Sequence, residues 1–402
     1  MSKLKIIFLF VSLIIWGYCS IKRTMLVDVG GGTLEGYLVV FFQCLIELIS
    51  IRCILKNINL IGKSSVCKWI LLWLYYAFII TVLNSTTLFH SLRDMMWWPL
   101  IFLLFHIFSI NVGIETINKI LVRYIIPTVI FVNVLVFLSL RTVSFENVLD
   151  GSEGFASSNP IFFVATLLPF CFLYKNKIIK YLLLILIIVS IILSFKRSAL
   201  IYAVMALAVA LYFDFIKQNK ISLLLRFILP TFIALVFYFI YTSIEEFTGG
   251  HLTERIEAMQ SDGGSGRLTI YDRMINCYED ELTFVEQLIG IGFDNAKTMY
   301  MRYHNELLSA HNDLLEMLID FGLIGLIIYL VIIFKIYKIV RQSKYMGLYY
   351  HQANLVAFLT FIVMSMVSHL FIYPTYYAYL LILWGITAGA LQKNKNTKQV
   401  LP

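Results

Sequence analysis

Long apolar runs separated by short polar segments recur along nearly the whole chain. Many of these runs approach the 20 or so residues that an α-helix needs to cross a bilayer. The pattern predicts an all-α, polytopic integral membrane protein with about twelve transmembrane helices. The expected spans are 4–21, 37–51, 69–83, 95–112, 120–140, 160–174, 181–195, 198–216, 222–241, 314–334, 351–370 and 376–391.

The composition agrees with a membrane location. The 402 residues are 60% hydrophobic and 14% charged, whereas soluble domains carry about 25% charged residues. So few charges cannot cover the surface of a soluble globule of this size. The N-terminus has Lys3 and Lys5 before an apolar run but no A-x-A cleavage site, which predicts an uncleaved first helix.

Basic residues set the expected orientation. The net charge is +8, but the cations lie at the ends of apolar segments and form no continuous face, so a nucleic-acid partner is excluded. With a cytoplasmic N-terminus, and with Lys5 at the start of the first span counted on that side, the inner segments hold 19 Lys and Arg residues and the short outer loops hold 6. This bias follows the positive-inside rule and predicts that both termini are cytoplasmic.

One long polar segment divides the helices into two groups. Residues 242–313 carry 13 of the 24 acidic residues, and the predicted orientation places this loop outside the cytoplasm. The expected organisation is therefore 1–241 with helices one to nine, 242–313 as an extracytoplasmic loop carrying part of the active site, and 314–402 with the last three helices.

The first candidate for chemistry is the pair Lys196 and Arg197, which interrupts an apolar stretch running from Tyr181 to Ile216. A tight outer turn at 194–198 is expected there. Two interpretations remain open. The cations can mark the turn by reaching the membrane interface, or they can bind a lipid phosphate or pyrophosphate. An outward-facing basic pair runs against the positive-inside trend, which favours a ligand.

The second candidate is Arg267, which follows Gly266 in a glycine-rich turn and begins an apolar-periodic segment. A turn of this kind entering a helix can hold an anion with free backbone N–H groups, and arginine adds a forked donor. A surface loop with one arginine would show the same pattern.

The third candidate is His311, where the polar loop enters the tenth expected span. Asn312 and Asp313 favour a helix start, so His311 should lie at the mouth of the bundle. Histidine exchanges a proton near neutral pH, which suits a general base. An interfacial histidine that anchors the helix end is the alternative, and His304 is a second histidine of similar setting.

Other sequence patterns give weaker evidence for a functional site. Trp97 and Trp98 fit an interfacial aromatic belt. The run LIGIGFDNA at 288–296 contains a GxG pair without the βαβ context of a dinucleotide site. No sequence pattern for a metal or a nucleotide sugar is present, so no metal and no cofactor are expected.

Four segments together resemble the O-antigen polymerase and O-antigen ligase family of bacterial membrane glycosyltransferases. They are SFKRSAL (194–200), SGRLTIYDR (265–273), LIGIGFDNA (288–296) and SAHNDLLEMLIDFGLIGL (309–326). The resemblance is specific over about 194–330, and elsewhere it rests on topology. Lys196 departs from the family, which usually has serine there.

The resemblance implies a fold similar to class C glycosyltransferases and substrates that are glycans on undecaprenyl pyrophosphate, as donor and as acceptor. It implies that Arg197 and Arg267, with Lys196 beside them, hold the pyrophosphate, and that His311 is the general base. Asn312 and Gly266 are supporting residues. A chain-length regulator is a further candidate partner, and the expected location is the bacterial inner membrane.

Three functions remain in competition. The preferred one is polymerisation of lipid-linked repeat units into O-antigen or into a capsular or exopolysaccharide on the outer face of the membrane. A ligase that transfers the glycan to the lipid A core or another acceptor would share the same motifs. A flippase or transporter of lipid-linked sugars would explain the helices, but its polar groups should lie near the midplane.

Overall fold

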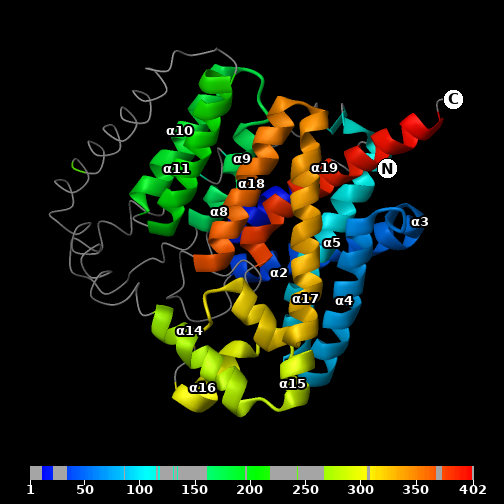
Figure 1. The fold of residues 1–402 in the computed structure, drawn as a ribbon. Coiled ribbons are helices and arrows are strands. Elements are labelled where there is room, and N and C mark those ends of the chain that lie inside the picture. The colour runs from blue at the N-terminus through cyan, green and yellow to red at the C-terminus, as the bar shows by residue number, and fades with distance from the viewer. Residues whose placement is uncertain are drawn as a thin grey trace.

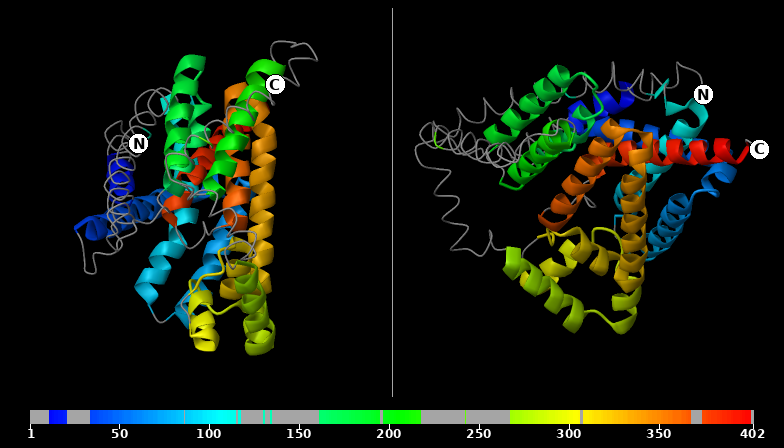
Figure 2. Two further views of the ribbon diagram at one scale, coloured as in Figure 1. Left: turned by 90° about the vertical axis from the view of Figure 1, so that its left-hand side faces the viewer. Right: turned by 45° about the horizontal axis from the view of Figure 1, so that its top comes forward.

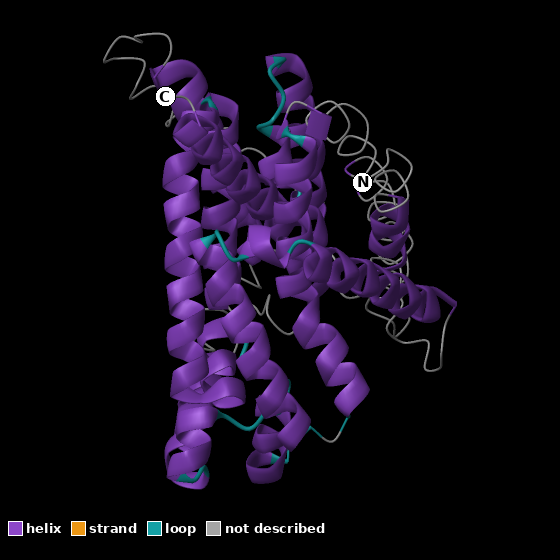
Figure 3. Cartoon of the chain, turned by 90° about the vertical axis from the view of Figure 1, so that its right-hand side faces the viewer, coloured by secondary structure: helices purple, strands orange, loops and turns teal. Residues whose placement is uncertain are grey.

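A computed structural model describes residues 11–20, 34–85, 87–114, 116–117, 130, 134, 161–194, 197–217, 242, 267–305, 308–367 and 374–400. All regular elements within these ranges are helices (Figure 3), so the expected all-α class is confirmed for this part of the chain. One helix covers 11–20. The others are α2 (Leu34–Lys56), α3 (Ile58–Ile61), α4 (Ser65–Asn84), α5 (Leu88–Val112), α8 (Ile161–Ala165), α9 (Leu168–Cys171), α10 (Lys177–Leu193), α11 (Arg197–Leu211), η2 (Tyr212–Lys217), α14 (Arg267–Asn276), η3 (Cys277–Glu281), α15 (Phe284–Ile289), α16 (Ala296–His304), α17 (Asp313–Gln342), η4 (Ser343–Met346), α18 (Leu348–Val367) and α19 (Pro374–Val400).

Four described helices are long and apolar enough to cross a membrane, namely Gly36–Lys56, Ser65–Asn84, Leu88–Val112 and Asp313–Met346. The described residues therefore support a membrane protein without confirming the count of twelve spans. The expected span 160–174 is interrupted: α8 and α9 are two short helices within the apolar helical segment Ile161–Cys171. Pro169 at the start of α9 has no N–H with which to continue the hydrogen-bond ladder. The expected spans 120–140 and 222–241 lie almost entirely outside the described residues.

Small residues bring α5 and α19 together in the interior of the bundle. A Cβ atom at Gly385 would lie 2.6 Å from the Phe102 carbonyl oxygen, and one at Gly389 would lie 2.4 Å from that of His106. The Ser109 hydroxyl donates to the carbonyl of Ile386 at 2.7 Å. This close approach surrounds α5 with neighbours and removes most of its side chains from the surface.

The tryptophans of α5 are core residues, which corrects the expected interfacial belt. Trp97 and Trp98 are fully buried. The Trp97 ring lies 4.8 Å from that of Trp16, and the Trp98 ring lies 4.7 Å from that of Trp73. Because α5 packs against α2, α4 and α19, its aromatic side chains face other helices instead of the membrane surface.

A buried ion pair orients the helix hairpin α10–α11 relative to α18. Lys180 pairs with Asp214, both nearly inaccessible, and the Gln352 amide donates to the same carboxylate at 3.4 Å. The beginning of α10, the end of the α11–η2 segment and the beginning of α18 therefore meet. The beginning of α11 at Arg197 lies at the opposite end of the hairpin, which is the end toward which α18 runs to Met366.

The helices α14, α15 and α16 gather at one end of the long helices (Figures 1 and 2). We call the described residues 267–305 and 308–312 the end piece. They are followed by α17, which is kinked because Gly322 has non-helical backbone angles. The kink separates two turns next to the end piece from a long straight helix.

Candidate functional site

The end piece has a small apolar core of its own. Helix α14 carries an apolar face, and residues from α14, η3 and α16 pack together with the turn before α17 and with one residue of α17. The buried members are Met274, Cys277, Ala296, Met299, Tyr300, Ala310 and Ile319. This core holds the beginning of α14 and the turn at 308–312 in a fixed relation, which matters because each contains a predicted site residue.

Two glycines attach the end piece to the kink of α17. Gly290 has a φ of 88° and Gly322 has a φ of 63°, a region that residues with side chains rarely adopt. A Cβ atom at Gly290 would lie 2.3 Å from the Asp320 carbonyl oxygen, and one at Gly322 would lie 2.4 Å from that of Leu288. The GxG run is therefore a close backbone contact that anchors the end piece.

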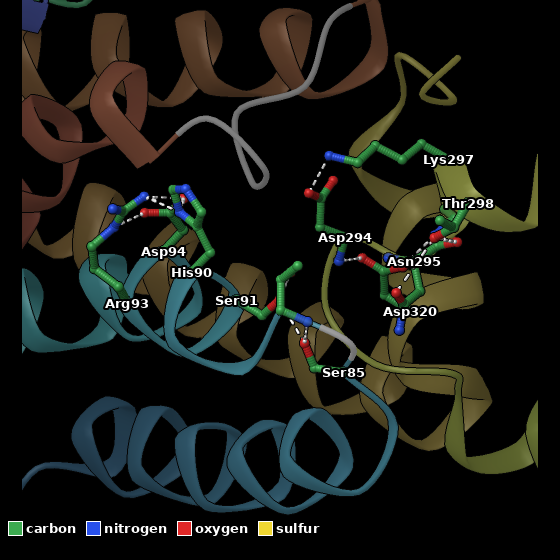
Figure 4. Close-up of polar contacts among 12 residues, drawn as sticks. Ser85, His90, Ser91, Arg93, Asp94, Asp294, Asn295, Lys297, Thr298 and Asp320 are labelled. Carbon is green, nitrogen blue, oxygen red and sulfur yellow. Dashed lines mark hydrogen bonds and ion pairs between the residues drawn. The ribbon is translucent and has the colours of Figure 1, made fainter. Parts of the chain in front are cut away.

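A carboxylate of α17 holds the beginning of α16. The buried Asp320 side chain accepts backbone N–H bonds from Asp294 at 2.7 Å, Asn295 at 3.1 Å and Ala296 at 2.9 Å (Figure 4). These N–H groups belong to the N-terminus of a helix, where a negative charge is favourable. Asp320 thus fixes the position of α16 against α17.

A second polar cluster lies beside this contact. Asp294 has a φ of 61° and pairs with Lys297. Burial raises the Asp294 pKa, the charge of Asp94 raises it further, and Lys297 and His90 lower it. Asp94 in turn binds Arg93 through both oxygens, at 2.7 and 2.9 Å (Figure 4). The beginning of α5 therefore faces the same end of the bundle as the end piece.

His311 lies in the turn that enters α17, with a left-handed backbone conformation of φ 52°. This conformation costs a residue with a side chain about 1 kcal/mol, so neighbouring contacts must hold it. The Asn312 side chain caps α17 by accepting two backbone N–H bonds at 3.0 and 3.2 Å, as its position predicts. Before the turn, the Ala310 N–H donates to the buried Glu316 carboxylate at 2.6 Å. Both flanks of His311 are thereby fixed to α17.

Tyr271 brings the arginine and the histidine of the expected site together. Its hydroxyl lies 3.3 Å from the His311 carbonyl oxygen and 3.1 Å from that of Met366. Burial raises the Tyr271 pKa, while the charge of Arg267 and a hydrogen bond with the Asn312 side chain lower it. Arg267, one helical turn before the tyrosine, therefore lies close to the entry of α17.

The structure places three of the predicted site residues in one location. It describes the backbone of a fourth and leaves two outside the described residues. His311 and Asn312 lie at the Tyr271 hydroxyl, and Arg267 lies one helical turn before Tyr271, close enough for its charge to lower the tyrosine pKa. Arg197 begins α11 at the same end of the bundle, but its side chain is not described. Gly266 and Lys196 lie outside the described residues.

Three contributors to this geometry were missed in the sequence, namely Tyr271, Glu316 and Asp320. The sequence could have indicated Glu316 and Asp320, because an ionisable group within an expected span is energetically costly and often has a specific partner. The sequence gives no such indication for Tyr271, since this residue fits the apolar face of α14 and only the fold shows that its hydroxyl contacts another segment.

These features define a class of protein, namely a membrane protein whose apolar helix bundle has a polar site at one end. The end piece at that site holds an arginine close to a histidine. Residues 182–330 match the family described as O-antigen ligase. The match begins within α10, ends within α17 and includes every predicted site residue. The resemblance to the O-antigen polymerase and ligase family is thus confirmed over this part of the chain, and it supports transfer of a glycan. No curated protein matches the chain.

Proposed function

We propose that this protein is a glycosyltransferase that polymerises oligosaccharide repeat units carried on undecaprenyl pyrophosphate. The observation that carries the proposal is the contact of the Tyr271 hydroxyl with the His311 carbonyl at 3.3 Å. It joins the helix that begins with Arg267 to the turn that holds the histidine. The family match over 182–330 supports the same class of reaction.

In the proposed reaction an acceptor hydroxyl attacks the anomeric carbon of the donor glycan. A new carbon–oxygen bond forms, the bond from that carbon to the pyrophosphate oxygen breaks, and the lipid pyrophosphate leaves with the electron pair. His311 takes the hydroxyl proton. Arg267 and Arg197 stabilise the charge that develops on the pyrophosphate, beside Lys196. One displacement without a covalent intermediate inverts the anomeric configuration, and the proposal includes no metal.

The proposed location is the inner membrane of a bacterium, with both termini cytoplasmic and the end piece on the outer face. A site at one end of the bundle suits a lipid-linked substrate, because the lipid stays in the bilayer while the glycan projects beyond it. The ligase differs only in its acceptor. A transporter is less well supported, because the described candidate residues lie at one end of the bundle, away from its middle.

The decisive experiment supplies purified protein with a lipid-pyrophosphate donor and one acceptor at a time. Longer lipid-linked chains indicate a polymerase, transfer to a lipid A core indicates a ligase, and movement of intact donor across a vesicle membrane without new glycosidic bonds indicates a transporter. The last outcome refutes the proposed class of reaction.

The same assay tests the histidine. His311→Ala should lower transfer by about two to four orders of magnitude, which is the usual contribution of a general base. His304 is the matched control, since it lies in the end piece, with its ring 4.7 Å from that of Tyr300. Equal and modest losses in both variants would leave the mechanism without its base.

The arginines are tested in parallel. Arg267→Ala and Arg197→Ala should each abolish elongation in protein that still reaches the membrane. Lysine at either position should restore activity only in part, because a point charge lacks the planar fork. Arg302 on α16 is exposed and provides the control. Wild-type chain lengths in Arg267→Ala would show that this arginine is a surface residue.

A further inference from the structure

Helical geometry places Arg267 and Tyr271 on one face of α14, because residues four positions apart lie one above the other. The tyrosine is half-buried at the point where the end piece contacts the entry of α17. Its hydroxyl is therefore the polar group through which this face of α14 can act on the His311 turn.

Asn312 lies beside the same hydroxyl. Its side-chain oxygen accepts two backbone N–H bonds at the beginning of α17, and its side chain lowers the Tyr271 pKa. The tyrosine in turn has one hydrogen, which it donates to the carbonyl of His311 or to that of Met366. Three segments thus meet at one oxygen: the beginning of α14, the turn at 311–312 and the end of α18.

The histidine at this junction needs support. Its backbone has a φ of 52°, a conformation that persists in a residue with a side chain only when the surroundings hold it. Glu316 fixes the N–H of the preceding Ala310, and Asn312 fixes the following helix. The carbonyl of His311 itself has the Tyr271 hydroxyl within reach. Losing this contact removes one of the groups that hold the His311 backbone in its position relative to α14.

We propose that Tyr271 is a positioning residue that sets the base His311 relative to the phosphate-binding Arg267, through the hydrogen bond from its hydroxyl to the His311 carbonyl. This inference rests on the proposed function. Tyr271 touches neither the donor glycan nor the reacting hydroxyl, and acts only through the histidine.

The test compares Tyr271→Phe with Tyr278→Phe in purified, folded protein. Both changes remove a single tyrosine hydroxyl from the end piece, and Tyr278 donates to the Gln287 carbonyl at 2.9 Å without contacting the His311 turn. Tyr271→Phe should lower kcat about tenfold, the upper range for loss of one hydrogen bond, with the donor KM changed less than about twofold. Tyr278→Phe should stay within about twofold of wild type.

A double-mutant cycle separates positioning from a general loss of stability. In a His311→Ala background, measured by single turnover of radiolabelled donor, Tyr271→Phe should cause less than about a twofold further loss, because there is no base left to position. Equal losses in both backgrounds overturn the proposal, and so does a loss no larger than that of Tyr278→Phe. If the wild-type protein forms no glycosidic bond, or if His311→Ala keeps full activity, the proposed function itself fails.

Discussion

Replacing Asp320 by asparagine should loosen the beginning of α16 while leaving the long helices intact. The carboxylate accepts three backbone N–H bonds, one at the oxygen facing Asp294 and two at the oxygen facing Asn295 and Ala296. The asparagine oxygen can still accept the N–H bonds from Asn295 and Ala296. Its NH2 group then faces the Asp294 N–H and cannot accept a hydrogen bond. One charge-assisted bond is lost, and such a bond contributes about 2–3 kcal/mol.

This magnitude predicts a measurable change in local opening. A loss of about 2–3 kcal/mol corresponds to roughly 30- to 150-fold faster exchange of the amide hydrogens at 294–299, measured by mass spectrometry of the protein in detergent. Asp272→Asn is the matched control, because it makes the same chemical change at an exposed position of α14. Exchange at Ala296 that is no faster in Asp320→Asn than in the control would refute the anchoring role.

Three further predictions follow from the orientation and the end piece. Reporter fusions at Lys220 and Gly263 should report opposite sides of the membrane, and the same side for both would reject the proposed topology. Gly290→Ala should cost about 1–3 kcal/mol in thermal unfolding and more than Gly347→Ala, which shares a positive φ but has no atom within 4 Å of its added Cβ. Burial raises the Asp294 pKa above 3.8, so its contribution to stability falls as the pH rises from 3.8 through the raised pKa. Asp294→Asn should make Tm decrease less over this pH range, and an unchanged pH dependence of Tm would contradict the prediction.

The class of fold and the start of α17 could be predicted from local pattern alone. Apolar runs indicate helices wherever they are long, and Asn312 followed by an acidic residue identifies a helix start because capping depends on a few adjacent atoms. The division of 160–174 into two helices was missed, although Pro169 marks it. The burial of Trp97 and Trp98 could not be predicted, since it depends on which helices surround α5.

The juxtaposition of Arg267 and His311 shows the same limit at the site. Each residue was identified by its local setting, but the distance between them is set by partners far away in the sequence. Tyr271 reaches the carbonyl of His311 across 40 positions and that of Met366 across 95. Periodicity assigns this tyrosine to the apolar face of a helix, and only the packing of α14 against the bundle gives its hydroxyl a partner.

The acidic residues at the beginning of α17 have a common physical explanation. Asp313, Glu316 and Asp320 lie in a helix that is otherwise apolar, where a carboxylate is costly without a donor. Each has one: Asp313 accepts the Ser365 hydroxyl at 2.6 Å, Glu316 accepts the Ala310 N–H, and Asp320 accepts three N–H groups. A site built on a mobile loop would tolerate displacements of an ångström or more, which is enough to lose a general base. Glu316 and Asp320 remove that freedom, because they tie the backbone at Ala310 and at the beginning of α16 to α17. These two carboxylates therefore hold the neighbouring end piece, and their positions in α17 match its N–H groups. Asp313 instead ties the beginning of α17 to Ser365 of α18.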